Sequence, residues 1–281
     1  MATAQIRSTA SKDETARGRV LGLTRAGIWV LAILAALNGL FLYFVPGRGD
    51  TDYAWAIQPP VNAAFIGAGF LAGTLATGLV LAFATRWRTF STLPIALWVL
   101  ATSLLVATIV HEDRFKFDYF PTWVWTVVYA GVPLAVPYLV WRQRRNADEA
   151  PAADPRLRTV RVVSAVLGAG LLAGSIALFA APVELGEHWL WPLTPLLARA
   201  VAAWYALFGT MLISCAVGMR RRADAIIPYA TLACWSVLLL LLPLLHPDDV
   251  SGGGPWYALM AALLALSAYA LRVGLPDREH L

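Results

Sequence analysis

Eight runs of about twenty apolar residues divide this chain, and they constrain its fold more than any other feature of the sequence. They lie at residues 26–45, 60–84, 93–110, 121–141, 160–181, 195–219, 226–246 and 255–273. A helix of roughly 20 apolar residues crosses the hydrocarbon core of a bilayer. Of the 281 residues, 59% are hydrophobic and only 14% are charged, which is too little charge to cover a soluble domain. The sequence therefore predicts an all-α, polytopic integral membrane protein with eight transmembrane helices.

The positive charges fall mostly on one side of these spans. With the N-terminus placed in the cytoplasm, 18 of the 22 Lys and Arg residues lie in cytoplasmic segments, and the others are Arg48, Arg114, Lys116 and Arg199. This asymmetry is the positive-inside pattern. It explains the net charge of +5 without a nucleic-acid partner. We expect a protein of the plasma (inner) membrane, surrounded by the lipid bilayer, with both termini in the cytoplasm.

The second half of the chain repeats landmarks of the first half. Trp55 and Trp191 precede the second and sixth spans, and His111 and His246 end the third and seventh, at nearly the same separation along the chain, which we call the repeat offset. The prolines that open the third and fourth spans recur at this offset. Proline is common in the first turn of a helix, but the shared offset indicates a tandem duplication. An even number of spans per repeat predicts a 4+4 parallel repeat, with both halves in the same orientation, as in parallel-repeat transporters.

This organisation divides the chain into five segments. We expect a disordered cytoplasmic tail over residues 1–25 and a first four-helix repeat over 26–141. A cytoplasmic linker over 142–159 leads to a second four-helix repeat over 160–275 and a short tail over 276–281. In the fifth span, Gly170-x-x-x-Gly174 is typical of a face on which two membrane helices pack closely.

Motifs of soluble enzymes are absent from the sequence, which contains no Walker loop, no G-x-G-x-x-G and no H-E-x-x-H. All four histidines lie at span ends or outside the spans, which argues against haem held by histidines within the bilayer. Cys215 and Cys234 lie inside apolar runs, so we expect no disulfide framework. Whether the protein is an enzyme stays open from the sequence.

Two H-x-D pairs stand at equivalent positions of the two halves. His111 and Asp113 follow the third span, and His246 and Asp248 follow the seventh. Imidazole and carboxylate ligands suit a divalent metal ion such as Zn²⁺, so these four residues are candidate metal ligands. The alternative is that they are the polar ends of helices, where the helix dipole favours a histidine.

Arg199 lies about one turn inside the sixth span, deeper than the other outer cations. A guanidinium at that depth faces the bundle interior or reaches the headgroups. We expect a carboxylate, a carbonyl cluster or a bound anion within hydrogen-bond distance of it. Either a structural salt bridge or an anionic-ligand site would account for Arg199. In the second span, the position equivalent to Arg199 falls near Asn62, which is therefore its candidate polar counterpart.

Aromatic residues crowd the outer boundary, which is consistent with membrane anchors but also with an aromatic-walled outward pocket. These tryptophans are Trp55, Trp123, Trp125, Trp189, Trp191 and Trp256. The candidate ligand-binding residues are Arg199, Asn62, Trp55, Trp191, Glu187 and His188. They predict a protein that binds or transports a small anionic or amphipathic ligand through an outward-facing pocket. The alternatives are a non-catalytic subunit that associates with other membrane subunits, and a membrane enzyme with an extracytoplasmic His/Asp metal site.

Overall fold

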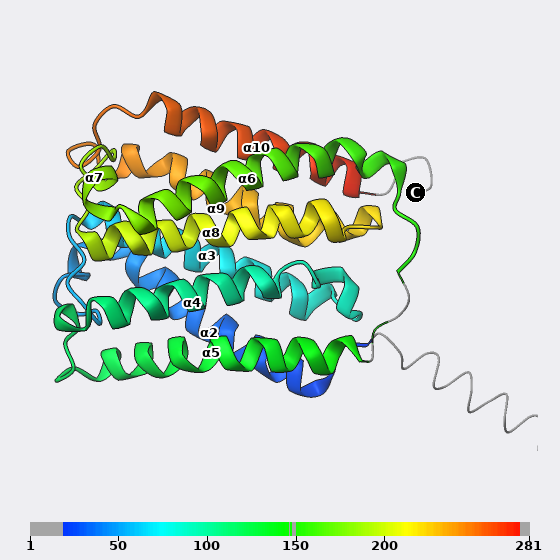
Figure 1. The fold of residues 1–281 in the computed structure, drawn as a ribbon, viewed down its shortest axis with the longest axis horizontal. Helices are drawn as coiled ribbons and strands as arrows, with labels where there is room; N and C mark the ends of the chain where they lie inside the picture. Colours follow the sequence, from blue (N-terminus) through cyan, green and yellow to red (C-terminus); the bar gives the residue numbers. More distant parts are fainter. Residues whose placement is uncertain (1–18, 146, 148–149, 276–281) are drawn as a thin grey trace, which may run out of the picture.

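The computed structural model describes residues 19–145, 147 and 150–275. This part of the chain contains nine α-helices, several short 3-10 turns and no strand. The long helices run side by side along one direction (Figure 1). Their bounds are α2 (Gly22–Phe44), α3 (Pro60–Phe83), α4 (Pro94–Val110), α5 (Phe120–Arg144), α6 (Arg158–Ala180), α7 (Pro182–Gly186), α8 (Pro195–Gly218), α9 (Ile226–Leu245) and α10 (Gly254–Gly274). The predicted tails lie largely outside the described residues, although α2 already begins at Gly22.

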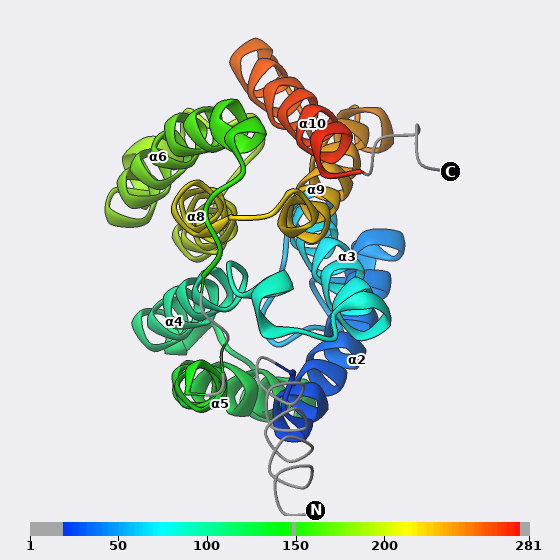
Figure 2. The same cartoon turned by 90° about the vertical axis from the view of Figure 1, so that its right-hand side faces the viewer.

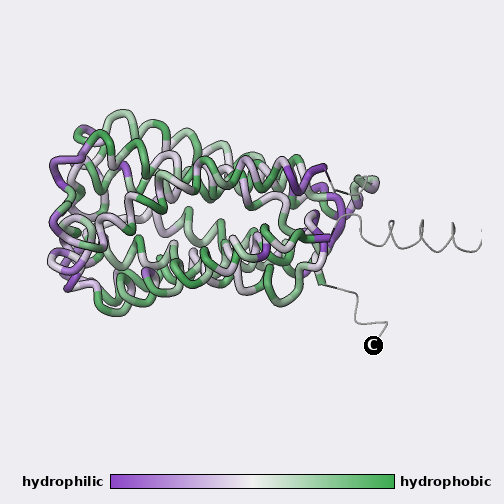
Figure 3. The backbone as a smooth tube through the Cα atoms, turned by 90° about the horizontal axis from the view of Figure 1, so that it is seen from below, coloured by the Kyte–Doolittle hydropathy of each residue, from purple (hydrophilic) through white to green (hydrophobic). Residues whose placement is uncertain are grey.

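Seven of these helices are long and apolar enough to cross a membrane, and α4 is a shorter apolar helix of 17 residues. Hydrophilic residues gather at the two ends of the bundle, and apolar residues fill the length between them (Figure 3). This distribution matches a bilayer with water on both sides. The chain is a polytopic, helical membrane protein, as the sequence predicted.

The two ends of the bundle differ in charge. We call the end where α2 begins and α5 ends the basic end; among the described residues it carries Arg142, Arg144, Arg145, Arg158 and Arg220–Arg222. We call the opposite end the acidic end; it carries Glu112, Asp113, Glu184, Glu187, Asp248 and Asp249. The two ends of the bundle are therefore electrostatically distinct.

Proline and a side-chain cap fix where helices start. α3, α4 and α8 each begin on a proline, whose missing N–H costs nothing in the first turn. At α8, the hydroxyl of Thr194 also accepts a hydrogen bond of 3.3 Å from the backbone N–H of Leu197, which satisfies one of the free donors of that turn.

Three helices, α3, α8 and α9, have more than half of their spans buried inside the bundle. Seen along the bundle (Figure 2), α2, α5, α6 and α10 lie at the periphery, and α4 lies at the left-hand edge between α8 and α5. The closely packed pairs are α2–α3, α3–α9, α9–α10, α6–α8, α8–α4 and α4–α5. By contrast, α2 and α5 make few contacts with each other, and so do α6 and α10. These two weakly packed pairs leave crevices on opposite sides of the bundle.

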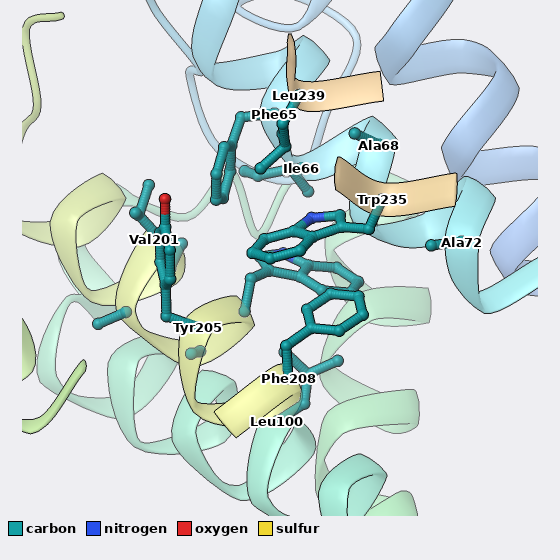
Figure 4. Packing of buried hydrophobic residues seen from close by; sticks show 14 of the residues in the cluster. Phe65, Ile66, Ala68, Ala72, Leu100, Val201, Tyr205, Phe208, Trp235 and Leu239 are labelled. Carbon is teal, nitrogen blue, oxygen red and sulfur yellow. The ribbon is translucent and has the colours of Figure 1, made fainter. Parts of the chain in front are cut away.

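Aromatic rings fill the centre where α3, α8 and α9 meet (Figure 4). The rings of Phe208 and Trp235 stack with centroids 4.0 Å apart, and Tyr205 meets Trp235 edge-on at 5.5 Å. Gly69 of α3 allows α8 to approach, because a Cβ atom at this position would lie 2.5 Å from the ring of Trp204. The helices at the centre are thus held by shape complementarity, since transfer from lipid to an equally apolar interior gives little driving force.

Candidate functional site: a groove between α6 and α10

A groove of about 760 Å³ lies between α6 and α10 towards the acidic end of the bundle. Its walls come from α6, α8 and α10, and its mouth comes from the loops before α8 and α10. Gly170 and Gly174 line it from α6, and a Cβ atom added at either glycine would meet no atom within 4 Å. The residues around the groove are Val166, Leu167, Gly170, Leu171, Gly174, Ser175, Leu178, His188, Trp189, Leu190, Tyr205, Ser251, Gly253, Pro255, Trp256 and Leu259.

The Gly170-x-x-x-Gly174 spacing predicted a close helix contact, and this prediction is wrong. The close approach of α6 to α8 occurs instead at Gly168, where an added Cβ atom would lie 3.0 Å from the carbonyl oxygen of Gly209. The spacing puts two glycines on one face of a helix, but it does not determine which face meets a neighbour. Here that face borders the groove.

Polar groups line the groove at two levels. Deep in the groove, Trp256 Nε1 donates a hydrogen bond of 2.8 Å to the Tyr205 hydroxyl, which keeps its own proton to donate. Near the mouth, His188 and Ser251 are exposed, and the buried indole N–H of Trp189 has no hydrogen-bond partner in the described part of the chain. Apolar walls with a few convergent polar groups are typical of small-molecule sites.

The matching crevice between α2 and α5 is filled at this depth. Asn38 is the counterpart of Gly174 at the repeat offset, and it accepts a hydrogen bond of 3.0 Å from the Tyr53 hydroxyl. Tyr53 packs edge-on against Trp125 at 6.0 Å, and Trp125 lies against Tyr129 with ring centroids 3.9 Å apart. Large side chains therefore occupy between α2 and α5 the space that glycines leave open between α6 and α10.

Arg199 does not line the groove; it lies where α4 meets α8. Its Nη1 atom is 2.6 Å from Nε2 of His111, the residue that caps α4, and its guanidinium carbon is 5.7 Å from the Phe179 ring centroid. A guanidinium only donates, so His111 accepts through an unprotonated Nε2. The expected anionic or carbonyl acceptor is thus replaced by a neutral imidazole.

The environment of His111 supports this neutral form. Burial, and then the positive charge of Arg199, lower the pKa of His111 below its ordinary value of 6.5, while Asp113 opposes them. A protonated ring would lose its acceptor nitrogen and bring two positive charges together. The sequence identified Arg199 and His111 separately, and the structure joins them.

Three other ligand candidates are buried in contacts between helices. Trp191 Nε1 donates a hydrogen bond of 2.9 Å to Asn62 Oδ1, and Asn62 Nδ2 donates one of 3.0 Å to the carbonyl oxygen of Pro192. These bonds join the start of α3 to the loop before α8. Trp55 packs edge-on against Trp125 at 4.6 Å. The structure brings Asn62 and Trp191 together, but inside the protein and away from the groove.

The last two ligand candidates, Glu187 and His188, are exposed in the segment between α7 and α8. His188 lines the groove, whereas Glu187 does not. Glu184 of α7 is exposed as well. The approach to the mouth from this side therefore carries negative charge.

The metal candidates were His111, Asp113, His246 and Asp248. Asp113 forms an ion pair with Arg114 at 3.0 Å, and His246 Nδ1 lies 3.8 Å from Asp249 Oδ2. Within the described ranges, no group of three or more His, Cys, Asp or Glu side chains could hold a metal ion. The metal site stays a prediction of the sequence, without support from the geometry.

Tyr205 and Ser251 are polar groove residues that sequence reasoning missed. A tyrosine within an apolar span looks like ordinary core, and a serine in a loop looks like ordinary surface. The signal for Tyr205 comes from the repeat. The repeat offset pairs it with Gly69, and this change in size between the two halves is the signal that points to it. Trp189 and Trp256 were noticed as boundary tryptophans, but their contact with one groove depends on how α8 and α10 pack.

No known protein family, no curated protein and no solved structure matches this chain. The function is therefore argued from the geometry of the groove.

Proposed function

We propose that this protein binds or transports a small amphipathic molecule through the groove between α6 and α10. The observation that carries the proposal is the hollow itself, which is apolar along α6 and α10 and has polar groups near its mouth. An alkyl or prenyl chain would lie along Gly170 and Gly174, and a polar head would lie near His188 and Ser251. The Tyr205 hydroxyl is the donor that a carbonyl or hydroxyl of the ligand would meet.

The charges around the mouth favour a neutral or cationic head group. Glu184 and Glu187 are exposed in the segment that leads to His188. Arg199, the residue that made an anionic ligand attractive, is bonded to His111 and lies outside the groove lining. We therefore retain the amphipathic ligand and do not propose the anionic one.

Photolabelling tests this proposal. The probe is a lysophosphatidylcholine with a diazirine in its single acyl chain, added to the purified full chain in lipid nanodiscs. We expect cross-links to peptides of α6 and α10, and a several-fold loss of these cross-links in Gly174→Leu, whose side chain fills the groove. Gly131→Leu, on α5 and likewise without a neighbour within 4 Å, is the matched control and should label as the wild type does. Equal labelling of α6 in Gly174→Leu and wild type would refute the proposal.

We further propose that the bundle consists of two tandem repeats of four spans, with α4 as the eighth span. The packed helix pairs support this, because exchanging α2 with α6, α3 with α8, α4 with α9 and α5 with α10 reproduces the same set of pairs. In the view along the bundle the exchanged helices lie on opposite sides of a common centre (Figure 2). The corresponding pseudo-twofold axis runs along the helices, as expected of a parallel repeat.

Hydrogen bonds between the helices and loops provide a second line of support. Three bonds in the first half have counterparts close to the repeat offset, and all six have lengths between 2.6 and 3.1 Å. The bond from Val20 N to Thr85 O has its counterpart in the bond from Asp154 N to Arg220 O. The bond from Arg25 Nη2 to Leu81 O has its counterpart in the bond from Arg161 Nε to Ala216 O. The bond from Lys116 N to Ala54 O has its counterpart in the bond from Ser251 N to Leu190 O. Unrelated halves would have no reason to place these bonds at one offset.

A further inference from the structure

A second hollow, of about 370 Å³, lies among α2, α3, α4 and α5 in the half of the bundle nearer the basic end. Its lining is hydrocarbon and aromatic apart from three threonines, and each threonine hydroxyl already donates to a protein acceptor. Thr77 and Thr231 donate to carbonyl oxygens of their own helices at 2.8 Å, and Thr24 donates to Gln143 Oε1 at 3.3 Å. Such a surface suits a hydrocarbon chain better than a polar ligand.

Polypeptide closes this hollow at the basic end. Trp87 and Phe90, in the 3-10 turn before α4, meet edge-on at 5.1 Å and line the hollow. The fully buried Gln143 of α5 accepts a hydrogen bond of 3.0 Å from Leu21 N and donates one of 2.7 Å to Arg19 O. These two bonds join the start of α2 to the end of α5.

The side of the hollow is open. Val30 of α2 and Ala135 of α5 both line the hollow and are exposed on the outer surface of the bundle. The two helices make few contacts with each other. Access is therefore lateral, from the bilayer, between α2 and α5.

Exposed arginines stand at the basic end of this lateral opening. Arg25 lies in the first turn of α2, and Arg142 and Arg145 lie at the end of α5. The guanidinium of Arg142 lies 5.8 Å from the Tyr138 ring centroid, and that of Arg145 lies 4.8 Å from the Trp141 ring centroid. Stacking on interfacial rings places both cations at headgroup depth, where a guanidinium binds phosphate. Their charge is complementary to an anionic lipid.

Side-chain size explains why the second half of the chain has no equivalent hollow at this depth. Ala76 and Thr77 line it, whereas their counterparts at the repeat offset are the larger Leu212 and Ile213. Leu212 is fully buried, and its Cβ would lie 3.0 Å from a Cβ added at Gly168 of α6. The second half is thus packed at the depth where the first half is hollow.

From these contacts we infer that the hollow between α2 and α5 holds one acyl chain of an anionic phospholipid, with the phosphate at Arg142 and Arg145. The lipid comes from the leaflet at the basic end, which the positive-inside rule assigns to the cytoplasmic side. The site is separate from the groove between α6 and α10 and does not depend on its function.

Native mass spectrometry of the full chain, released from nanodiscs with equal amounts of phosphatidylglycerol and phosphatidylcholine, tests this inference. We expect one retained phosphatidylglycerol. The double variant Ala76→Leu/Thr77→Ile introduces the side chains of the second half and should reduce the adduct several-fold. Arg142→Gln/Arg145→Gln should abolish the preference for phosphatidylglycerol over phosphatidylcholine while leaving the hollow able to hold a chain.

Matched variants separate this site from general lipid binding. Gly78→Leu, exposed on α3 with no neighbour within 4 Å, should keep the adduct, and so should Gly174→Leu in the other groove. If Ala76→Leu/Thr77→Ile fails to fold, Ala135→Leu at the exposed rim provides the same test and should also lose the adduct. An adduct that survives in a folded variant with a filled hollow, or a wild type without preference for phosphatidylglycerol, would overturn the inference.

Discussion

At the scale of single residues, the contact between Arg199 and His111 makes the packing of two helices depend on one proton. The bond needs an unprotonated Nε2 on His111, and the geometry places it 2.6 Å from a permanently charged guanidinium. Arg199 belongs to α8 and His111 ends α4. Protonation of His111 would therefore weaken the contact between the two helices at the acidic end.

We predict that acid destabilises the protein through this pair. Since the pKa of folded His111 is lowered below 6.5, the unfolded chain binds more protons as pH falls through that value, and the free energy of unfolding decreases. Thermal unfolding in nanodiscs between pH 7.5 and 5.5 measures the slope. His111→Gln keeps an acceptor for Arg199 and should flatten the slope in part. The remaining slope comes from other groups, including His246. Burial lowers the pKa of His246 as well, and the charge of Asp249 opposes this shift.

The control for this prediction is His188→Gln, which changes an exposed histidine and should leave the slope as in the wild type. A slope in His111→Gln equal to that of the wild type would show that the contact between Arg199 and His111 does not control the response to acid.

Asn62 is a second single residue whose substitution we expect to change stability, and we predict a structural role for it. Asn62→Ala leaves the Trp191 N–H and the Pro192 carbonyl without their partner, and each buried unsatisfied group costs about 1–3 kcal/mol. The thermal midpoint should fall by several degrees, while photolabelling of α6 and α10 stays unchanged. Gln58→Ala, which removes an exposed hydrogen bond to Asp50, is the control and should change neither. Loss of photolabelling in a stable Asn62→Ala would return this residue to the ligand site.

At the scale of helices, the glycines of two Gly-x-x-x-Gly spacings, Gly69 with Gly73 in α3 and Gly170 with Gly174 in α6, have opposite roles. Gly69 is pressed against Trp204, whereas Gly170 borders open space. The difference lies in the partner helix: α3 meets α8 at Gly69, and α6 meets α8 through Gly168 rather than Gly170. Whether a glycine joins helices or borders a hollow is therefore set by the rotation of its helix.

We predict that alanine substitutions reveal these two roles. Gly69→Ala places a methyl group within contact distance of the Trp204 ring and should destabilise the protein by about 1–3 kcal/mol through overpacking. Gly170→Ala should be neutral or stabilise by up to about 1 kcal/mol, because alanine favours a helix interior over glycine. Denaturant or thermal unfolding of both variants under the same conditions measures the difference. Equal loss of stability in both would mean that α6 packs closely at Gly170 after all.

At the scale of the whole molecule, charge separates the two ends of the bundle, and this separation predicts the topology. Arginines gather at the basic end and most carboxylates of the described loops at the other. The positive-inside rule places the basic end in the cytoplasm. Cysteine labelling in intact cells, with Cys215 and Cys234 replaced by alanine, tests this: Glu187→Cys should react with an impermeant reagent, and Ala150→Cys should not. Reaction of Ala150→Cys would show that the basic end lies outside the cell and that the predicted orientation is wrong.

The sequence alone predicted a polytopic helical membrane protein, and the structure confirms it, because helix length and apolarity are local properties that a bilayer fixes directly. It also singled out Arg199, His111 and His188 as candidate site residues. It did not predict which of them meet, since Arg199 and its partner His111 belong to different helices, far apart in the sequence. The repeat offset stays a prediction that the paired helix contacts support.

Only the tertiary structure decided which helices lie inside and where the hollows form. α2 and α3 have nearly equal mean hydropathy, 2.0 and 1.9, yet 17% of the α2 span is buried inside the bundle and 56% of the α3 span. Hydropathy cannot separate them, because lipid tails and the protein interior are equally apolar. A hollow forms where two neighbouring helices make few contacts, as α6 and α10 or α2 and α5 do, and where a small residue such as Gly174 or Ala76 lines the space. That depends on distances between elements, which no local pattern of residues records.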